Sequence, residues 1–399
     1  MSARNSLQSY GRVARLFHWT TAALILAAIP LGIIANRLPY DTTEALARKA
    51  QLFSVHKTLG VVVFVVAIGR ILWAVTQTHP APIHPDRRAE LWMAQLVHWM
   101  LYISLVAVPL TGWVHHAAVT GFAPILWPFG QGLPFVPQSE QVALVAGSAH
   151  WVFTKLMIGA IVLHVAGALK HHLIDRDGTL RRMLRGTPAP NAMTAGTSRA
   201  RAMPLVAALA LFGLGAGVAA LPRGEQTVTA PIAAPIQNDG NWRVMDGSLS
   251  ITVAQLGQAV TGSFTAWSAD ITFDESAADG RHGRVTVTID TTSLELGSVT
   301  AQAKDAEFFD VATFPQAVFA ADIVAASQGY EATGMLTLRG VDVPVTLPFT
   351  LDLAGGTAIM AGRTDLDRRS FAMGLKYPDE SSIGFDVTVD VALTATRKN

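Results

Sequence analysis

The sequence predicts a membrane protein made of two different parts, a bundle of membrane-spanning helices followed by an all-β domain. Half of the 399 residues are hydrophobic and the mean hydropathy is +0.35, high for a soluble protein but low for one lying wholly in a membrane. Charge is divided unequally, because Met1 to Leu221 holds 18 Lys/Arg against 7 Asp/Glu, whereas Pro222 to Asn399 holds 12 against 22. From Asn241 onward, apolar residues recur at every second position, as in half-buried strands.

Five apolar runs are long enough to cross a bilayer as helices. Their ranges are Leu16 to Ile34, Phe53 to Val75, Leu91 to Val114, Ser148 to His172 and Pro204 to Leu221. The first four form one expected unit over residues 8–185, and the fifth, at 204–221, spans ~27 Å as a helix. Segments rich in Pro, Ala and Thr or poor in apolar pattern predict linkers over 186–203 and 222–240.

The distribution of Lys and Arg predicts how the helices are oriented. The N-terminal segment, the second connection and the segment after the fourth run are basic, whereas the third connection carries neither Lys nor Arg. Because cytoplasmic loops carry such an excess, we expect both ends of the four-helix unit in the cytoplasm and the β domain in the periplasm of a bacterium. The first connection, with Arg37, Arg48 and Lys49, counts weakly against this orientation. The basic surface therefore indicates a lipid membrane and no nucleic-acid partner.

Residues 241–396 are expected to form a small antiparallel barrel or sandwich of about eight strands. The strand candidates are Trp242 to Val253, Val260 to Phe273, Arg284 to Asp290, Gln316 to Ala325, Tyr330 to Leu338, Val341 to Leu347, Ala358 to Asp365 and Phe385 to Leu393. Lys304 to Asp310 is too charged for a strand and is expected to form a helical turn.

Histidines inside the apolar runs are the candidates for chemistry. A histidine in hydrocarbon is costly unless something binds it, and His150 and His164 stand 14 residues apart on the fourth run. Fourteen residues make nearly four helical turns, so the two imidazoles share a face and lie ~21 Å apart along the axis. The chain has no cysteine, which excludes disulfides, thiolate metal sites and covalently attached c-type haem. Two haem b groups held non-covalently by histidine fit this pattern.

The expected depth of each histidine decides how they pair. His18 begins an outward helix and His164 lies late in an inward one, so both are expected toward the cytoplasm. His56 and His150 each begin an inward helix, so both are expected toward the periplasm. Two bis-histidine sites result, and six-coordinate iron in such sites transfers electrons because it has no vacant position for a substrate.

Other readings of these histidines remain open at this point. A single membrane histidine is often only hydrogen-bonded to a neighbouring helix, and His98 is a rival ligand that could replace His18 or contact a haem edge. His115, His116, His171 and His172 are expected at the membrane interfaces, solvated or bonded to a haem propionate.

The helical part resembles the bacterial cytochrome b561 family. The resemblance rests on Arg15-Leu-Phe-His18-Trp19, Ser54-Val-His56-Lys57-Thr-Leu-Gly60, Leu96-Val-His98-Trp, Ala149-His150-Trp and Leu163-His164-Val-Ala-Gly-Ala-Leu-Lys-His171-His172. It implies a four-helix dihaem cytochrome of the inner membrane that exchanges electrons with quinone, such as ubiquinone, and it implies haem ligation by His18, His56, His150 and His164. One branch of the family oxidises superoxide and reduces ubiquinone, which makes superoxide a candidate donor.

The β domain resembles the YceI family. The matching segments include Trp242-Arg-Val-Met-Asp246, Ile289-Asp290-Thr-Thr-Ser293, Lys304-Asp305-Ala-Glu-Phe308-Phe309-Asp310 and Gly334-Met-Leu-Thr-Leu-Arg-Gly340. The resemblance implies a lipocalin-like barrel that can enclose an isoprenoid lipid. At Met245-Asp246-Gly247 the sequence departs from the usual start of the family pattern, which puts the ligand in doubt more than the fold. Inward apolar residues also fill a small barrel without any ligand, so a packed core is the alternative to a cavity.

These observations lead to one hypothesis and two alternatives. The hypothesis is a dihaem b cytochrome that moves electrons between a periplasmic donor and the quinone pool, joined to a periplasmic lipid-binding barrel. In the first alternative, the helices are the cytochrome subunit of a larger dehydrogenase. In the second, the chain is mainly a lipid-binding protein with a haem-containing membrane anchor.

Overall fold

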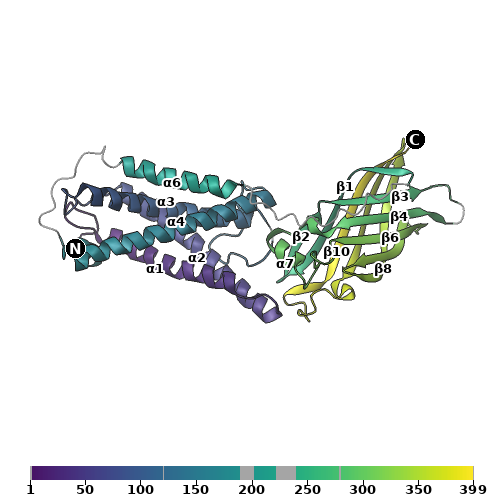
Figure 1. Cartoon of the computed structure of the whole chain (residues 1–399), viewed down its shortest axis with the longest axis horizontal. Coiled ribbons are helices and arrows are strands. Elements are labelled where there is room, and N and C mark those ends of the chain that lie inside the picture. The colour runs from purple at the N-terminus through teal and green to yellow at the C-terminus, as the bar shows by residue number, and fades with distance from the viewer. Residues whose placement is uncertain (1, 120, 189–201, 222–239, 278–279, 399) are drawn as a thin grey trace. The chain divides into compact units, whose positions relative to one another are not determined.

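A computed structural model describes residues 2–119, 121–188, 202–221, 240–277 and 280–398 of the chain (Figure 1). It divides into two compact units. The first comprises Met1–Arg37, Gln51–Val119 and Pro124–Arg223, and the second comprises Leu38–Ala50, Thr120–Ala123 and Gly224–Asn399. Most of the predicted linkers, 186–203 and 222–240, lies outside the described residues.

Five helices in the described part of the chain are long and apolar enough to cross a membrane. They are α1 (Arg12–Arg37), α2 (Thr43–Val75), α3 (Arg88–Ala117), α4 (Glu140–Leu173) and α6 (Ala202–Ala220). A short helix that the sequence did not predict, α5 (Thr179–Leu184), follows α4. Each predicted apolar run corresponds to one of the long helices, which confirms the helical membrane region and makes this an integral membrane protein.

Helix α4 begins eight residues earlier than the apolar run predicted, at Glu140 rather than Ser148. Ser139 caps the helix, because its backbone is extended and its side-chain oxygen accepts a hydrogen bond from the backbone N–H of Val142 at 3.4 Å. Glu140 adds a negative charge in the first turn, where the helix dipole favours it. The cap, not the hydrophobic pattern, therefore sets the start of this helix.

The long helices pack through a mixture of small, aliphatic and aromatic side chains. Helices α3 and α4 pack along each other, and α6 lies against both of them (Figure 1). The buried side chains include Val97, Phe153, Met157 and Phe212. Large aliphatic side chains such as Leu163 remain exposed on the outside. This distribution suits a bundle surrounded by lipid, where leucine gains nothing from being buried.

The second unit contains an antiparallel sheet of ten strands. These are β1 (Trp242–Gln255), β2 (Gln258–Phe264), β3 (Trp267–Phe273), β4 (Arg281–Asp290), β5 (Leu294–Glu295), β6 (Gln316–Ala325), β7 (Tyr330–Leu338), β8 (Val341–Ala354), β9 (Thr357–Asp367) and β10 (Ile383–Arg397). β1 pairs with β10 along its length and with β3 at Trp242, so eight of the strands close into a ring, with β2 and β5 added at one edge. The predicted lipocalin-like barrel is confirmed (Figure 1).

One predicted strand, Val260 to Phe273, is two strands in the structure. The chain bends at Thr265 and Ala266, whose backbone N–H groups bond to the carbonyl and hydroxyl oxygens of Ser293. β2 pairs with β1 and β5, whereas β3 pairs with β4 and the start of β1. The bend depends on a residue 27 positions away, so local alternation could not reveal it.

Candidate haem and ligand sites

His56 on α2 and His150 on α4 face each other, with ring centroids 6.3 Å apart and planes at 84°. His56 Nδ1 lies 2.8 Å from the carbonyl oxygen of Ala28 on α1, and His150 Nδ1 lies 2.8 Å from that of Val108 on α3. Because a carbonyl can only accept, each Nδ1 carries the proton and donates it. Each Nε2 therefore presents a lone pair that can bind a metal ion.

Two glycines allow these imidazoles to approach the neighbouring helices. A Cβ atom on Gly32 would lie 2.7 Å from His56 Cε1, and one on Gly112 would lie 2.9 Å from His150 Nδ1. Each glycine lies four residues after the residue whose carbonyl accepts the imidazole hydrogen bond, on the same face of the helix. The missing side chain leaves space there for the imidazole ring. The sequence does not predict the role of these glycines, since that role depends on contacts between helices.

His115 is held in the same way. Its Nδ1 donates to the carbonyl of Ala143 at 2.7 Å, and a Cβ on Gly147, four residues further, would lie 3.0 Å from that nitrogen. Its neighbour His116 has a buried Nδ1 with no hydrogen-bond partner among the described residues. His116 interacts electrostatically with Lys57, whose side chain is buried beside His56. The region around His56 and His150 thus contains one buried amine, Lys57, whose positive charge suits an anionic partner.

His18 on α1 and His164 on α4 form the second pair, with ring centroids 6.0 Å apart and planes at 53°. His98 on α3 joins them, because its ring centroid lies 5.1 Å from that of His164. Its ring also bonds to the backbone of Ala94, one turn earlier. The structure therefore brings together both predicted pairs and also places the rival ligand His98 beside one of them.

The two pairs occupy different levels of one continuous helix. Helix α4 runs unbroken from Glu140 to Leu173 and carries one member of each pair. Its geometry separates His150 from His164 by ~21 Å along the axis. Two other basic groups that could meet a haem edge, Arg70 and Lys155, lie over the rings of Tyr102 and Trp151 at 5.2 and 5.3 Å.

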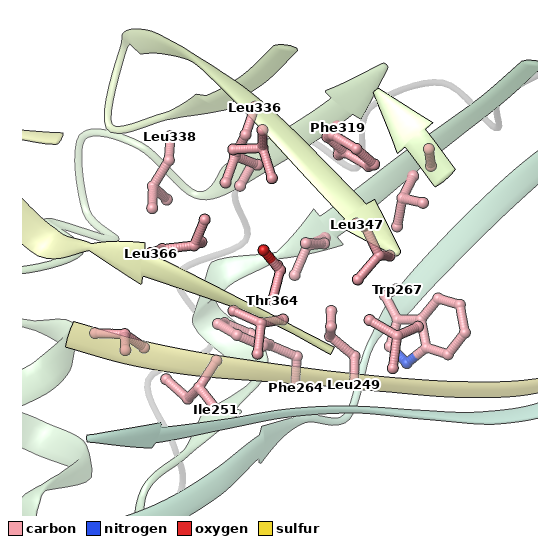
Figure 2. A pocket seen from close by; sticks show the side chains of 18 of the residues that line it. Leu249, Ile251, Phe264, Trp267, Phe319, Leu336, Leu338, Leu347, Thr364 and Leu366 are labelled. Carbon is pink, nitrogen blue, oxygen red and sulfur yellow. The ribbon is translucent and has the colours of Figure 1, made fainter. Parts of the chain in front are cut away.

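The barrel encloses a cavity of about 270 Å³ (Figure 2). Its wall is almost wholly aliphatic and aromatic, and labelled side chains such as Leu249, Phe264, Trp267 and Phe319 surround the space. The polar members of the lining are Gln255, Thr291, Gln302, Thr364 and Arg368. A lining of this kind favours a long apolar molecule with a small polar group.

The polar lining residues differ in whether their own hydrogen bonds are complete. The buried guanidinium of Arg368 donates to five backbone carbonyls, at 2.8 to 3.3 Å, and so has a structural role. The amide nitrogen of Gln255 donates to Gln302 at 3.4 Å, but its buried Oε1 has no partner among the described residues. A buried acceptor without a partner costs stability, so Gln255 marks a position where a ligand can donate a hydrogen bond.

Comparisons with known proteins assign each part of the chain. A family model for prokaryotic cytochrome b561 matches residues 9–186, and a model for the YceI-like domain matches residues 242–395. The chain is 29% identical over 184 residues to cytochrome b561 homolog 2 of Escherichia coli (strain K12), covering 46% of this chain and 95% of that protein. It is 26% identical over 132 residues to the probable superoxide oxidase CybB of Yersinia pestis, covering 33% and 73%.

The β domain has relatives of its own. The chain is 31% identical over 144 residues to UPF0312 protein VPA0850 of Vibrio parahaemolyticus, covering 34% of this chain and 70% of that protein. It is also similar to the crystal structure of Burkholderia cenocepacia BcnA, with 31% identity, a TM-score of 0.36 and coverage of 38% and 96%. Cytochrome b561 proteins carry out membrane electron transfer, and the match to their family model implies a haem of the b type. Residues 9–186 of the chain thus match the prokaryotic cytochrome b561 family, and residues 242–395 belong to the YceI family.

Proposed function

We propose that the helical unit binds two haem b groups, one between His56 and His150 and the other between His18 and His164. When two imidazoles bind one metal ion from opposite sides through Nε2, their ring centroids lie about 6.3 Å apart, since each metal–nitrogen bond is about 2.0 Å. The observed separations of 6.3 and 6.0 Å match this distance. The single observation that carries the proposal is this spacing, found at two levels of the same helix.

The surroundings of the first pair support the same role. Ligating histidines almost always donate their other ring N–H to a carbonyl or carboxylate, which fixes the tautomer and the ring orientation. Both His56 and His150 do so. Gly32 and Gly112 leave room for these orientations. The chain's own residues therefore hold each imidazole before the metal arrives.

His18, not His98, is the proposed partner of His164. The centroid separation between His98 and His164 is 5.1 Å, shorter than two ligands of one iron require, and His98 is already bonded within its own helix. His98 is expected to flank the macrocycle instead. A haem assay on the purified chain tests this assignment. We expect two haems per chain in the wild type and in His98→Ala, and one in His18→Ala; one haem in the wild type would reject the paired sites.

We propose that these sites carry electrons between a periplasmic donor and quinone in the bacterial inner membrane. Haem supplies reversible one-electron chemistry. A resemblance to superoxide oxidases makes superoxide the proposed donor: two superoxide anions each lose one electron to give oxygen, and the two electrons with two protons convert quinone to quinol. Lys57, buried beside His56, is the group that can provide positive charge to attract an anion.

Stopped-flow measurements test the donor. Mixing the oxidised protein with superoxide should reduce haem, and added ubiquinone should reoxidise it. Lys57→Met should slow reduction by superoxide, while an excess of dithionite should still reduce the haem completely. Haem that stays oxidised in superoxide while dithionite reduces it would refute superoxide as the donor and leave the haem sites standing.

We propose that the barrel binds an isoprenoid lipid or isoprenoid quinone in its cavity. The apolar wall supports a polyprenyl chain and the unpartnered Oε1 of Gln255 supports a ligand hydroxyl. Ala358 on β9 lines the cavity, whereas Ala361, three residues on, points outward. We expect Ala358→Phe to reduce lipid co-purifying with the full chain, measured by mass spectrometry, and Ala361→Phe to retain it. Equal lipid content in both variants would contradict the cavity as the binding site.

A further inference from the structure

Three potential metal ligands from three separate segments meet beside the end of α4. His84 lies in the connection between α2 and α3, His171 lies in the last turn of α4, and Asp177 lies between α4 and α5. Oδ2 of Asp177 is 3.0 Å from His84 Nε2 and 2.7 Å from His171 Nδ1. The two imidazole rings are parallel within 5° and their centroids lie 6.3 Å apart. The ligand atoms of the three side chains thus all lie within 4.8 Å of one another.

The cluster is partly protected from water yet open to small ions. The side chain of Asp177 is 8% exposed, and those of His84 and His171 are 32% and 25% exposed. Asp177 Oδ1 accepts a hydrogen bond from the backbone N–H of Thr179 at 2.8 Å, which orients the carboxylate. Burial raises the pKa of Asp177, but hydrogen bonds from Thr179 and His171 outweigh it and lower the pKa to about 2. The carboxylate is therefore ionised at physiological pH.

We propose that His84, His171 and Asp177 bind a divalent transition-metal ion, with Zn²⁺ as the favoured ion. Neutral imidazole and carboxylate are a typical ligand set for zinc, with bonds of about 2.0 to 2.2 Å and a water molecule in the fourth position. Ligand atoms in such a tetrahedral site lie about 3.3 Å apart. The two distances to Asp177 Oδ2 are only slightly shorter. Each imidazole nitrogen needs to move a few tenths of an ångström away from Asp177 Oδ2, and all three ligand atoms already lie within 4.8 Å of one another.

The neighbouring acidic groups do not form an equally good site. Glu90 and Asp175 also lie near His171, but both carboxylates are engaged by cations. Lys170 Nζ lies 2.7 Å from Glu90 and 3.1 Å from Asp175, and Arg87 lies 3.1 Å from Asp175. Binding a metal there would require breaking these ion pairs. The guanidinium of Arg182, which interacts electrostatically with Asp177, is bonded to backbone carbonyls instead.

The proposed ion would link two parts of the bundle near one haem site. Through His84 it would fix the connection between α2 and α3 to the end of α4. His171 follows His164 by seven residues, or two helical turns, so the ion would lie roughly 10 Å along α4 from that proposed haem ligand. A hydrogen-bonded His–Asp–His cluster without metal would make the same link, and zinc binding distinguishes the two.

Isothermal titration of the detergent-purified, chelator-treated holoprotein with zinc chloride tests the proposal. His172→Ala is the matched control, because His172 adjoins the cluster but is exposed and is not a member of it. We expect the wild type and His172→Ala to bind one more zinc ion per chain than Asp177→Asn, or to bind it at least tenfold more tightly. His84→Gln, in the connecting segment, should show the same loss as Asp177→Asn.

Haem content and melting temperature without zinc show whether each variant is folded, and His84→Gln decides the question if Asp177→Asn does not fold. The proposal is overturned if the folded variants bind zinc as the wild type does. It is equally overturned if the wild type binds zinc no more tightly than about 1 mM. Either result would leave a hydrogen-bonded cluster and would not affect the proposed haem sites, which are measured separately by absorption.

Discussion

Replacing Gly32 by alanine tests whether the geometry around His56 supports a haem. The new Cβ would lie 2.7 Å from Cε1 and 2.9 Å from Nδ1 of His56. Non-bonded carbon atoms prefer about 3.5 to 4.0 Å, so the imidazole must move by about 1 Å and weaken its hydrogen bond to Ala28. The substitution therefore displaces a proposed ligand without altering its chemistry.

The size of the effect follows from the cost of overpacking. Adding a methyl group to a filled site typically costs about 1 to 3 kcal/mol. If this cost appears in haem binding, affinity at the His56/His150 site falls about 5- to 150-fold, since 1.4 kcal/mol is a factor of ten. Alanine is also favoured over glycine in a helix by about 1 kcal/mol. Helix α1 itself should therefore not be weakened, and the loss should be confined to one haem.

The assay is haem content per chain, together with the rate at which haem is lost to an excess of apomyoglobin. Gly213→Ala in α6 is the control, because that glycine is exposed and an added Cβ would meet nothing within 4 Å among the described residues. We expect Gly32→Ala to lose one haem faster and Gly213→Ala to match the wild type. A Gly32→Ala protein that keeps both haems with unchanged dissociation would refute the role assigned to this contact.

Three further predictions follow from the same structure. Gly112→Ala should weaken binding of the same haem as Gly32→Ala, because its Cβ meets the ring of His150. A redox titration in which the two variants lose different haems would contradict this. Arg368→Met should destabilise the barrel by at least about 3 kcal/mol in thermal unfolding, since it leaves buried carbonyls unpaired. Arg369→Met, which removes an ion pair with Asp367 and a contact over the ring of Phe385, should cost much less. Gln255→Leu should reduce affinity for an isoprenol about tenfold in a displacement assay and leave affinity for the matching hydrocarbon unchanged. Equal losses for both ligands would refute the hydrogen bond.

The fold followed from patterns that are local in the sequence. Apolar runs located the long helices, and strict alternation in segments such as Gln316 to Ala325 located strands whose alternate residues line the barrel. Features set by distant contacts were not predicted. The break between β2 and β3 depends on Ser293, and the start of α4 depends on a cap outside the apolar run.

In the candidate sites too, some features could be predicted from the local sequence and others depend on distant contacts. The positions of His56 and His150 in their helices were enough to predict that they would lie at one depth, and ligation by them remains a prediction. Gly32, by contrast, carries no signal in the sequence, because its importance arises from an imidazole on another helix. His84 and Asp177 were missed for a similar reason, since they meet only when a connection folds back on the end of α4.

The glycine one turn beyond each acceptor carbonyl affects how fast the proposed haem between His56 and His150 could exchange electrons. His56 and His150 each donate an N–H···O bond to a neighbouring helix and lie against the bare glycine backbone of that same helix one turn further on. Rings fixed in this manner cannot swing when the charge between them changes by one unit. At the proposed haem, little nuclear rearrangement would then accompany oxidation or reduction, which would lower the barrier to electron transfer.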